Sequence, residues 1–171
     1  ILNHKNQTQK IVLPVPGIHN IANSLAASAA AVHLGFDLAS IANGLKKLSA
    51  SNGRLMTIPC SEKLVLIDDS YNANPSSMRA AIDVLALKQG YKIAILGEMA
   101  ELGDFSKKLH LDLAKYVSKS EVDKVYLIGP FAGEMAELVG KKAKVSATKD
   151  EVFNSLVSEE RIFELDENML V

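Results

Sequence analysis

One short stretch of the sequence holds most of the side chains that could do chemistry. Four apolar residues, Leu64 to Ile67, are followed directly by the carboxylates Asp68 and Asp69. The loop that comes next contributes neutral hydrogen-bonding groups from Ser70, Tyr71, Asn72 and Asn74. An apolar run before a polar loop is typical of a buried strand in an open parallel sheet, where ligands bind outside the carboxyl ends of the strands. The stretch therefore predicts a binding site at a strand end.

The two carboxylates do not form an obvious metal or acid–base pair. Asp68 and Asp69 are neighbours, and neighbouring residues in an extended segment point to opposite sides. We expect one of them to cap the following turn. Asn74 precedes Pro75, which is typical of a helix N-cap with proline in the first turn. A structural role is the simpler interpretation of Asn74, with a binding role as the alternative.

A second acidic group follows another apolar run. Glu98 comes directly after Gly97, and Glu101 and His110 lie further along the chain. These three side chains could point into one crevice, where a carboxylate would attract the ammonium form of an amine and help to accept its proton. The structural alternative is that Glu101 and His110 cap and pair on a helix surface.

Further polar groups occur near the N-terminus and between the two halves of the chain. His19, Asn20 and Asn23 stand at the start of a helical pattern, and the two asparagines share one face because they are three residues apart. Their amides can donate and accept, which suits a purine edge, a ribose hydroxyl or a phosphate oxygen. Capping by Asn20 and packing of His19 are the structural alternative. Arg54 could bind phosphate through its planar fork of donors, or form an ordinary ion pair between domains.

The elements that must position these groups alternate between strand and helix from residue 64 onwards. Such alternation predicts right-handed β-α-β crossovers and a parallel sheet with helices on both faces, which is a small Rossmann-like α/β domain. The expected strands are Leu64–Ile67, Lys92–Leu96, Lys124–Ile128, Ala143–Ser146 and Met169–Val171, and the expected helices are Ser76–Leu87, Ser106–Ser118, Phe131–Leu138 and Lys149–Val157.

The first fifty residues form a separate segment in this interpretation. Small residues at 49–53 are typical of a connection between domains, so we expect one domain at 1–50 and another at 54–171. Asp37 is a candidate N-cap. The expected elements of the first segment are a strand at Val12–Gly17 that ends in a proline and glycine turn, and helices at Ile18–His33 and Leu38–Leu48.

Composition excludes several classes of protein. The chain has 171 residues, 48% of them hydrophobic, which is enough for a sizeable core. A formal net charge of −1 gives no electrostatic case for binding nucleic acid or an anionic membrane. The single cysteine, Cys60, excludes an internal disulfide, no Cys/His cluster supports zinc, and no apolar run is long enough to cross a bilayer. We expect a monomeric cytoplasmic protein without membrane insertion.

Four motifs give the sequence a resemblance to the Mur ligases. The block from Asp68 to Met78, followed by Ala80-Ala81, resembles the motif after the interdomain hinge of MurF-type enzymes. Gly17 to Ala27 and Asn52-Gly53-Arg54-Leu55 are similar to the final ATPase-domain helix and the junction that Mur ligases share with folylpolyglutamate synthetases. Gly97 to Gly103, with His110 after it, resembles the MurF-type signature of the C-terminal domain.

The resemblance implies an ATP-dependent ligase of peptidoglycan synthesis. Such an enzyme activates the carboxylate of UDP-N-acetylmuramoyl-tripeptide as an acyl phosphate, and the amine of D-alanyl-D-alanine then attacks it to give an amide. ATP and Mg²⁺ are the implied cofactors. The implied roles are ATP contacts for His19, Asn20, Asn23, Arg54 and Asp69, substrate contacts for Ser70, Tyr71, Asn72, Asn74, Glu98 and Glu101, and catalysis for Glu98 and His110.

Two elements of the family do not occur in this sequence. They are the Gly-x-x-x-x-Gly-Lys-Ser/Thr phosphate-binding loop and a Lys-Gly-Ser-Arg segment. We therefore expect a C-terminal fragment, made of the tail of the central ATPase domain and most of the C-terminal domain, without ligase or ATPase turnover alone.

The alternatives are a fragment of another Mur-type ligase or of a folylpolyglutamate synthetase, and a non-catalytic Rossmann-like module that binds a dipeptide or nucleotide. Those enzymes usually carry an Asp-Tyr-Ala-His-type motif after the strand, so the asparagine-rich loop favours the MurF type. The central geometric expectation is that residues 69–74 and Glu98 emerge along one sheet edge, opposite the helix that begins near His19.

Overall fold

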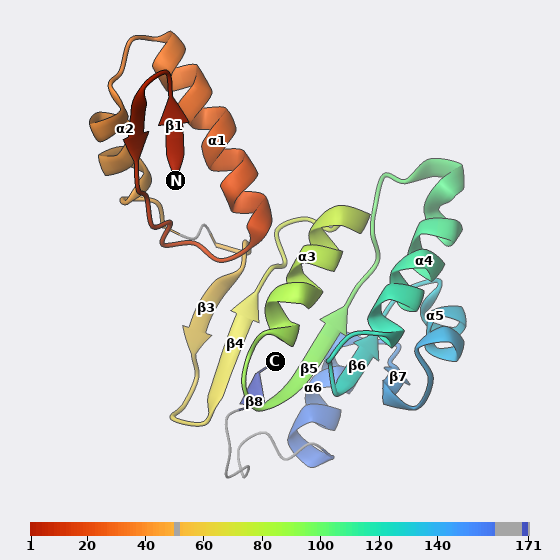
Figure 1. Cartoon of the computed structure of the whole chain (residues 1–171). Coiled ribbons are helices and arrows are strands. Elements are labelled where there is room, and N and C mark those ends of the chain that lie inside the picture. Colours follow the sequence, from red (N-terminus) through yellow and green to blue (C-terminus); the bar gives the residue numbers. More distant parts are fainter. Residues whose placement is uncertain (50–51, 160–168, 171) are drawn as a thin grey trace. The chain divides into compact units, whose positions relative to one another are not determined.

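The computed structural model describes residues 1–49, 52–159 and 169–170 and divides the chain into two compact units, Ile1–Ser51 and Asn52–Val171 (Figure 1). Ala50 and Ser51 of the expected connection lie outside the described residues, as does Val171 of the expected last strand.

The N-terminal unit combines a small hairpin with two helices. Strands β1 (Leu2–His4) and β2 (Gln7–Gln9) pair antiparallel and are followed by α1 (Ile18–His33) and α2 (Leu38–Leu45). The Asp37 carboxylate accepts the Ser40 N–H at 2.7 Å, which confirms Asp37 as the cap of α2. The buried apolar residues of this unit are Leu2, Leu38, Ile41 and Leu45, with Ala42 beside them.

The N-terminal unit corrects three expectations. The hairpin was not expected, because its residues are almost all polar. The strand expected at Val12–Gly17 is wrong, since these residues form no ladder; Pro14 and Pro16 cannot donate hydrogen bonds to a neighbouring strand. Helix α2 ends at Leu45, before the expected Leu48, and its chain continues in short turns.

The C-terminal unit is built on a six-stranded sheet in the order β3-β4-β8-β5-β6-β7. Strand β3 pairs antiparallel with β4, and the remaining neighbours run parallel. Sequence reasoning missed β3, a short edge strand that ends in proline, a residue confined to such positions. The strands are β3 (Met56–Pro59), β4 (Leu64–Asp68), β5 (Tyr91–Leu96), β6 (Lys124–Leu127), β7 (Ala143–Val145) and β8 (Met169–Leu170).

Helices cover both faces of this sheet, which confirms the predicted α/β class. Alternation along the strands explains the two layers, because successive side chains point to opposite faces. On one face Ala94, Leu96, Val125 and Leu127 pack against α3, α4 and α5, and on the other Ile93 and Tyr126 pack against α6. The helices are α3 (Pro75–Ala86), α4 (Ser106–Ser118), α5 (Ala132–Val139) and α6 (Lys149–Ser158), with 3-10 turns at Gly103–Phe105 and Gly140–Lys142.

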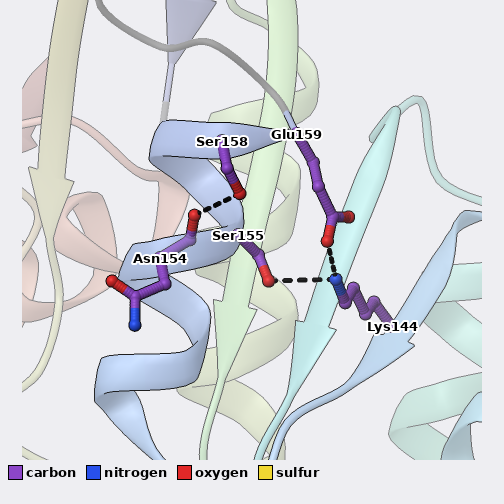
Figure 2. A network of polar contacts seen from close by, with 5 residues as sticks. All are labelled: Lys144, Asn154, Ser155, Ser158 and Glu159. Atoms are coloured by element: carbon purple, nitrogen blue, oxygen red, sulfur yellow. Dashed lines mark hydrogen bonds and ion pairs between the residues drawn. The ribbon is translucent and has the colours of Figure 1, made fainter.

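A small polar network ties α6 to the edge strand β7 (Figure 2). Lys144 Nζ donates to Ser155 Oγ at 2.9 Å and forms an ion pair with Glu159, which lowers the pKa of the Glu159 carboxyl. Ser158 Oγ donates to the Asn154 carbonyl within the same helix at 2.6 Å. The network fixes the end of α6 against the sheet.

Within the ranges that the structure describes, each helix is too short or too polar to serve as a membrane span.

Candidate functional site

Among the loops at the carboxyl edge of the C-terminal sheet, three concern the predicted site. Residues 69–74 follow β4, residues 97–102 follow β5, and residues 128–131 follow β6 (Figure 1). Because β4, β8, β5 and β6 run parallel, these loops all lie at the carboxyl edge of the sheet, where open α/β folds bind ligands. The first part of the central geometric expectation, one shared edge for residues 69–74 and Glu98, therefore agrees with the topology.

The segment before β3 is held against the loop after β4. Asp69 Oδ1 accepts the Leu55 N–H at 3.0 Å, and the Tyr71 N–H donates to the Gly53 carbonyl at 2.9 Å. Gly53 has a φ of 69°, and a Cβ there would lie 2.8 Å from the Tyr71 nitrogen, so the close approach requires glycine. These bonds place the Arg54 guanidinium 4.5 Å from the centre of the Tyr71 ring.

Side-chain to backbone hydrogen bonds also order the polar loop after β4. Asp68 Oδ1 accepts the Ser70 N–H at 3.1 Å, so the expectation that one of the two carboxylates caps the turn is confirmed. The Ser70 hydroxyl and its N–H, with a smaller contribution from the Gly53 N–H, lower the pKa of the Asp68 carboxyl, because they stabilise its ionised form. Asn72 Oδ1 accepts the N–H of Ala73 at 2.8 Å.

Asn74 is the N-cap of α3. Its side-chain oxygen accepts from the N–H groups of Ser76 and Ser77 at 3.0 and 2.9 Å, and the Ser77 hydroxyl accepts the Asn74 N–H at 3.1 Å. This reciprocal arrangement is a capping box, with Pro75 in the first turn. The structural interpretation of Asn74 is confirmed, and its oxygen already has two donors.

The loop after β5 presents Glu98 and buries Met99. The Glu98 side chain is exposed, whereas Met99 is 1% exposed. Glu101 is also exposed and takes a left-handed conformation with a φ of 61°. The two carboxylates are thus accessible at the sheet edge.

His110 lies beneath this loop. It is 2% exposed, its Nε2 atom accepts the Met99 N–H at 2.9 Å, and its Nδ1 atom lies 2.8 Å from the Ser106 carbonyl. The expectation that His110 points into a crevice with Glu98 and Glu101 does not match this position, because both ring nitrogens are engaged inside the unit. We therefore assign no proton transfer to His110.

Sequence reasoning placed a loop after β6 but did not assign it to the site. Gly129 has a φ of 122°, and a Cβ placed on it would lie 3.4 Å from the Cβ of Glu98. The loop after β6 therefore passes close beside Glu98, and its nearest approach at Gly129 is made by backbone. The signal was present as glycine and proline directly after an apolar run, a pair that marks a loop.

In the N-terminal unit the three polar candidates, His19, Asn20 and Asn23, have different surroundings. Asn20 Nδ2 donates to the Pro16 carbonyl at 2.6 Å, and the His19 ring folds over Gly17, where a Cβ would collide with it. His19 Nδ1 is buried without a hydrogen-bond partner, and Asn23 is exposed on α1. The expectation that this helix start faces the edge of the C-terminal sheet stays a prediction.

The N-terminal unit also contains an apolar cavity of about 380 Å³. Ser24 and Ser28 are the hydroxyl side chains of its lining, and the Ser28 hydroxyl is already bonded to the Ser24 carbonyl at 2.6 Å. The rest of the lining is mainly aliphatic and includes Leu13, Ile18, Ile21, Leu25 and Leu45.

In the described part of the chain, no three His, Cys, Asp or Glu side chains are grouped so as to hold a metal ion.

Comparisons with known proteins agree at the levels of sequence and structure. A family model described as "Mur ligase, glutamate ligase domain" matches residues 53–162. The UDP-N-acetylmuramoyl-tripeptide–D-alanyl-D-alanine ligase of Escherichia coli (strain K12) is 44% identical over 119 residues, which are 70% of this chain and 26% of that protein.

Two solved structures are similar over nearly the whole chain. A crystal structure of MurF from Acinetobacter baumannii matches with a TM-score of 0.85 and 35% identity, over 94% of this chain and 35% of that one. MurF ligase from Thermotoga maritima in complex with ADP matches with a TM-score of 0.71 and 25% identity, over 91% of this chain and 34% of that one. The chain thus spans about a quarter to a third of the length of these relatives.

Proposed function

The chain belongs to the Mur ligase family by its glutamate ligase domain, and we propose that it supplies the dipeptide-receiving part of a MurF-type ligase. In this proposal the complete enzyme uses ATP to join D-alanyl-D-alanine to UDP-N-acetylmuramoyl-tripeptide. The observation that carries it is the shared strand-end edge, where Arg54, the polar loop 69–74 and Glu98 are gathered by one sheet. The name of the E. coli relative, at 44% identity, supports the choice of substrates.

Arg54 is the side chain in the C-terminal unit that best fits a nucleotide. It is exposed, its planar fork of donors matches phosphate oxygens, and the Tyr71 ring and the Asp69–Leu55 bond fix its surroundings. ATP, when bound, supplies the phosphoryl group that activates the tripeptide carboxylate. ADP in the T. maritima relative is consistent with a nucleotide site in this fold. Mg²⁺ is the proposed second cofactor of the complete enzyme; in the described residues no three His, Cys, Asp or Glu side chains are grouped to hold it, so most of its ligands would come from other parts of the enzyme.

Glu98 is proposed to receive the amine of the dipeptide. Its exposed carboxylate would attract the ammonium group, and the bare backbone at Gly129 leaves room beside it. The exposed Ser70 and Asn72 offer neutral groups to the peptide amide and carboxylate. Holding the amine near the activated carboxylate converts a bimolecular reaction into an effectively unimolecular one.

Residues 54–171 would then be the C-terminal domain of the ligase, and residues 1–50 the tail of its ATP-binding domain, with His19, Asn20 and Asn23 on the nucleotide side. We further propose a monomeric enzyme of the cytoplasm. Separate binding of the two substrates makes domain closure part of the reaction.

A panel of amino acceptors tests the proposed activity. The full-length protein is incubated with ATP, UDP-N-acetylmuramoyl-tripeptide and either D-alanyl-D-alanine, lysine, diaminopimelate or glutamate, and the products are identified by mass spectrometry. We expect phosphate release and an amide product only when the amino acceptor is D-alanyl-D-alanine. Ligation of a single amino acid in place of the dipeptide would instead favour another Mur-type ligase or a folylpolyglutamate synthetase.

The isolated chain offers a second test. We expect no phosphate release from ATP above a buffer blank and only weak binding of ATP or D-alanyl-D-alanine in calorimetry. Tight binding of either ligand by the 171 residues alone would favour a free-standing binding module.

A further inference from the structure

A hydrogen bond to a buried side chain anchors the backbone of the loop after β5. The Met99 N–H does not continue the sheet ladder but donates to Nε2 of His110 at 2.9 Å. Met99 and His110 are 1% and 2% exposed, so this hydrogen bond is shielded from water. Removing the acceptor would leave a buried N–H unsatisfied, which is costly.

The two bonds of His110 fix the state of its ring. Because the Met99 N–H is a donor, Nε2 must be the acceptor, and the ring hydrogen then sits on Nδ1 and is donated to the Ser106 carbonyl at 2.8 Å. The neutral imidazole therefore bridges the loop to the first turn of α4. A ring in this bridging state has no free nitrogen with which to take a proton from a substrate.

The loop after β6 contacts both the His110 bridge and Glu98. The Phe131 ring packs on the His110 ring with centroids 4.9 Å apart, and the same loop contains Gly129, which approaches Glu98. Glu101 has a φ of 61°, a conformation that a residue with a side chain rarely adopts and that neighbouring contacts must maintain. Glu98 thus precedes the anchored Met99 in the chain and lies beside Gly129 of the loop after β6.

We propose that His110 is a positioning residue that orients Glu98 toward the dipeptide amine by holding the Met99 backbone. This inference rests on the proposed function, in which Glu98 receives D-alanyl-D-alanine. It assigns His110 to substrate binding through the loop and takes it out of proton transfer.

Two conservative variants separate the two bonds of the bridge. In His110→Gln the side-chain amide oxygen can reach the position of Nε2 and accept the Met99 N–H. In His110→Asn the shorter amide can replace Nδ1 toward Ser106 but cannot reach Met99. The pair therefore differs in the bond that matters to the proposal while both retain a polar side chain.

The first measurement is amide hydrogen exchange of the 171-residue chain, followed by NMR. We expect the Met99 amide to exchange about tenfold faster in His110→Asn and to stay close to wild type in His110→Gln. The Ile128 amide, which donates to the Leu96 carbonyl at 3.0 Å on the neighbouring strand end, serves as the internal control and should not change. Unchanged exchange of Met99 in His110→Asn overturns the proposal.

The second measurement is the steady-state kinetics of the full-length ligase. We expect His110→Asn to raise KM for D-alanyl-D-alanine about tenfold with little change in KM for ATP, and His110→Gln to restore it. Equal loss of kcat in both variants, with a folded protein, would show that the imidazole itself is needed and would overturn the positioning role. If wild-type enzyme does not use the dipeptide, the proposed function fails, and Met99 exchange still decides whether His110 holds the loop.

Discussion

The two units of the chain differ in how completely they bury their apolar side chains. In the C-terminal unit Ile93, Leu113, Val117 and Val125 are fully buried between the sheet and its helices. In the N-terminal unit α1 exposes a row of aliphatic residues, with Ile18 85%, Ile21 51% and Leu25 50% exposed. An apolar helical face needs a partner, and within this unit the face lines a cavity of about 380 Å³ instead.

This difference shows which unit can maintain a precise site by its own packing. The C-terminal sheet is closed on both faces, so the loops at its edge rest on a rigid support. The N-terminal unit has a small core of a few side chains and a short hairpin. We expect the two to respond unequally to separation, to core mutation and to loss of caps.

The largest effect is expected from separating the units. Residues 52–171 expressed alone should show a cooperative unfolding transition and dispersed NMR spectra, because they retain the main core. Residues 1–51 alone should lack both, since their core consists of a few side chains and a single small core supplies little stability. Circular dichroism and NMR check both pieces. A cooperatively folded piece 1–51, or an unfolded piece 52–171, would contradict the comparison.

Matched leucine-to-alanine substitutions should distinguish the stabilities of the two cores. Leu113→Ala removes a fully buried side chain from the C-terminal core and should lower the free energy of unfolding of that unit by about 2–5 kcal/mol, through lost burial and a new cavity. Leu45→Ala in the N-terminal core should leave this transition unchanged. Chemical denaturation of the full chain measures both. Equal shifts from the two variants would mean that the units unfold as one.

Loss of a helix cap should have a smaller effect. Asn74→Ala removes the acceptor for two N–H groups of α3 and should cost about 1 kcal/mol of stability in the C-terminal unit. Asn72→Ala, in the same exposed loop, is the control and should cost less than about 0.5 kcal/mol. Asp37→Ala removes the corresponding cap from α2 and should loosen only the N-terminal unit. A cost for Asn72→Ala as large as that for Asn74→Ala would argue against the cap.

Acid should weaken each unit through its own aspartate. The pKa of Asp68 is lowered from 3.8 by Ser70, and the pKa of Asp37 is lowered from 3.8 by Ser40. A folded-state pKa below the unfolded value contributes stability that is present above pH 3.8 and is lost as the pH falls through the lower value. Asp68→Asn should therefore flatten the acid-side pH dependence of the C-terminal transition, and Asp37→Asn should not. An unaltered pH dependence in Asp68→Asn would contradict this assignment.

Much of the C-terminal unit could be predicted because its signals are local. The cap at Asn74, the helix Ser106–Ser118 and the apolar strands are set by short-range propensity and periodicity, and the structure has them at or near the expected residues. The MurF-type motifs indicated the Mur ligase family, and the family model that matches residues 53–162 confirms it.

The errors have physical causes of a different kind. The hairpin of residues 2–9 and strand β3 are stabilised by pairing with a partner strand, which a single segment of sequence does not reveal. The burial of His110 depends on Met99 and Phe131, which meet it only in the folded unit. A polar residue near an acidic loop is equally compatible with a crevice and with a core.

The proposed function depends most on Glu98 as the group that receives the dipeptide amine. The direct test is Glu98→Gln in the full-length protein, with Glu137→Gln, an exposed glutamate on α5, as the matched control. We predict that Glu98→Gln raises KM for D-alanyl-D-alanine about tenfold or more, because it removes a charge-assisted contact, and leaves KM for UDP-N-acetylmuramoyl-tripeptide unchanged. An unaltered KM for the dipeptide in Glu98→Gln would contradict the proposed role of Glu98.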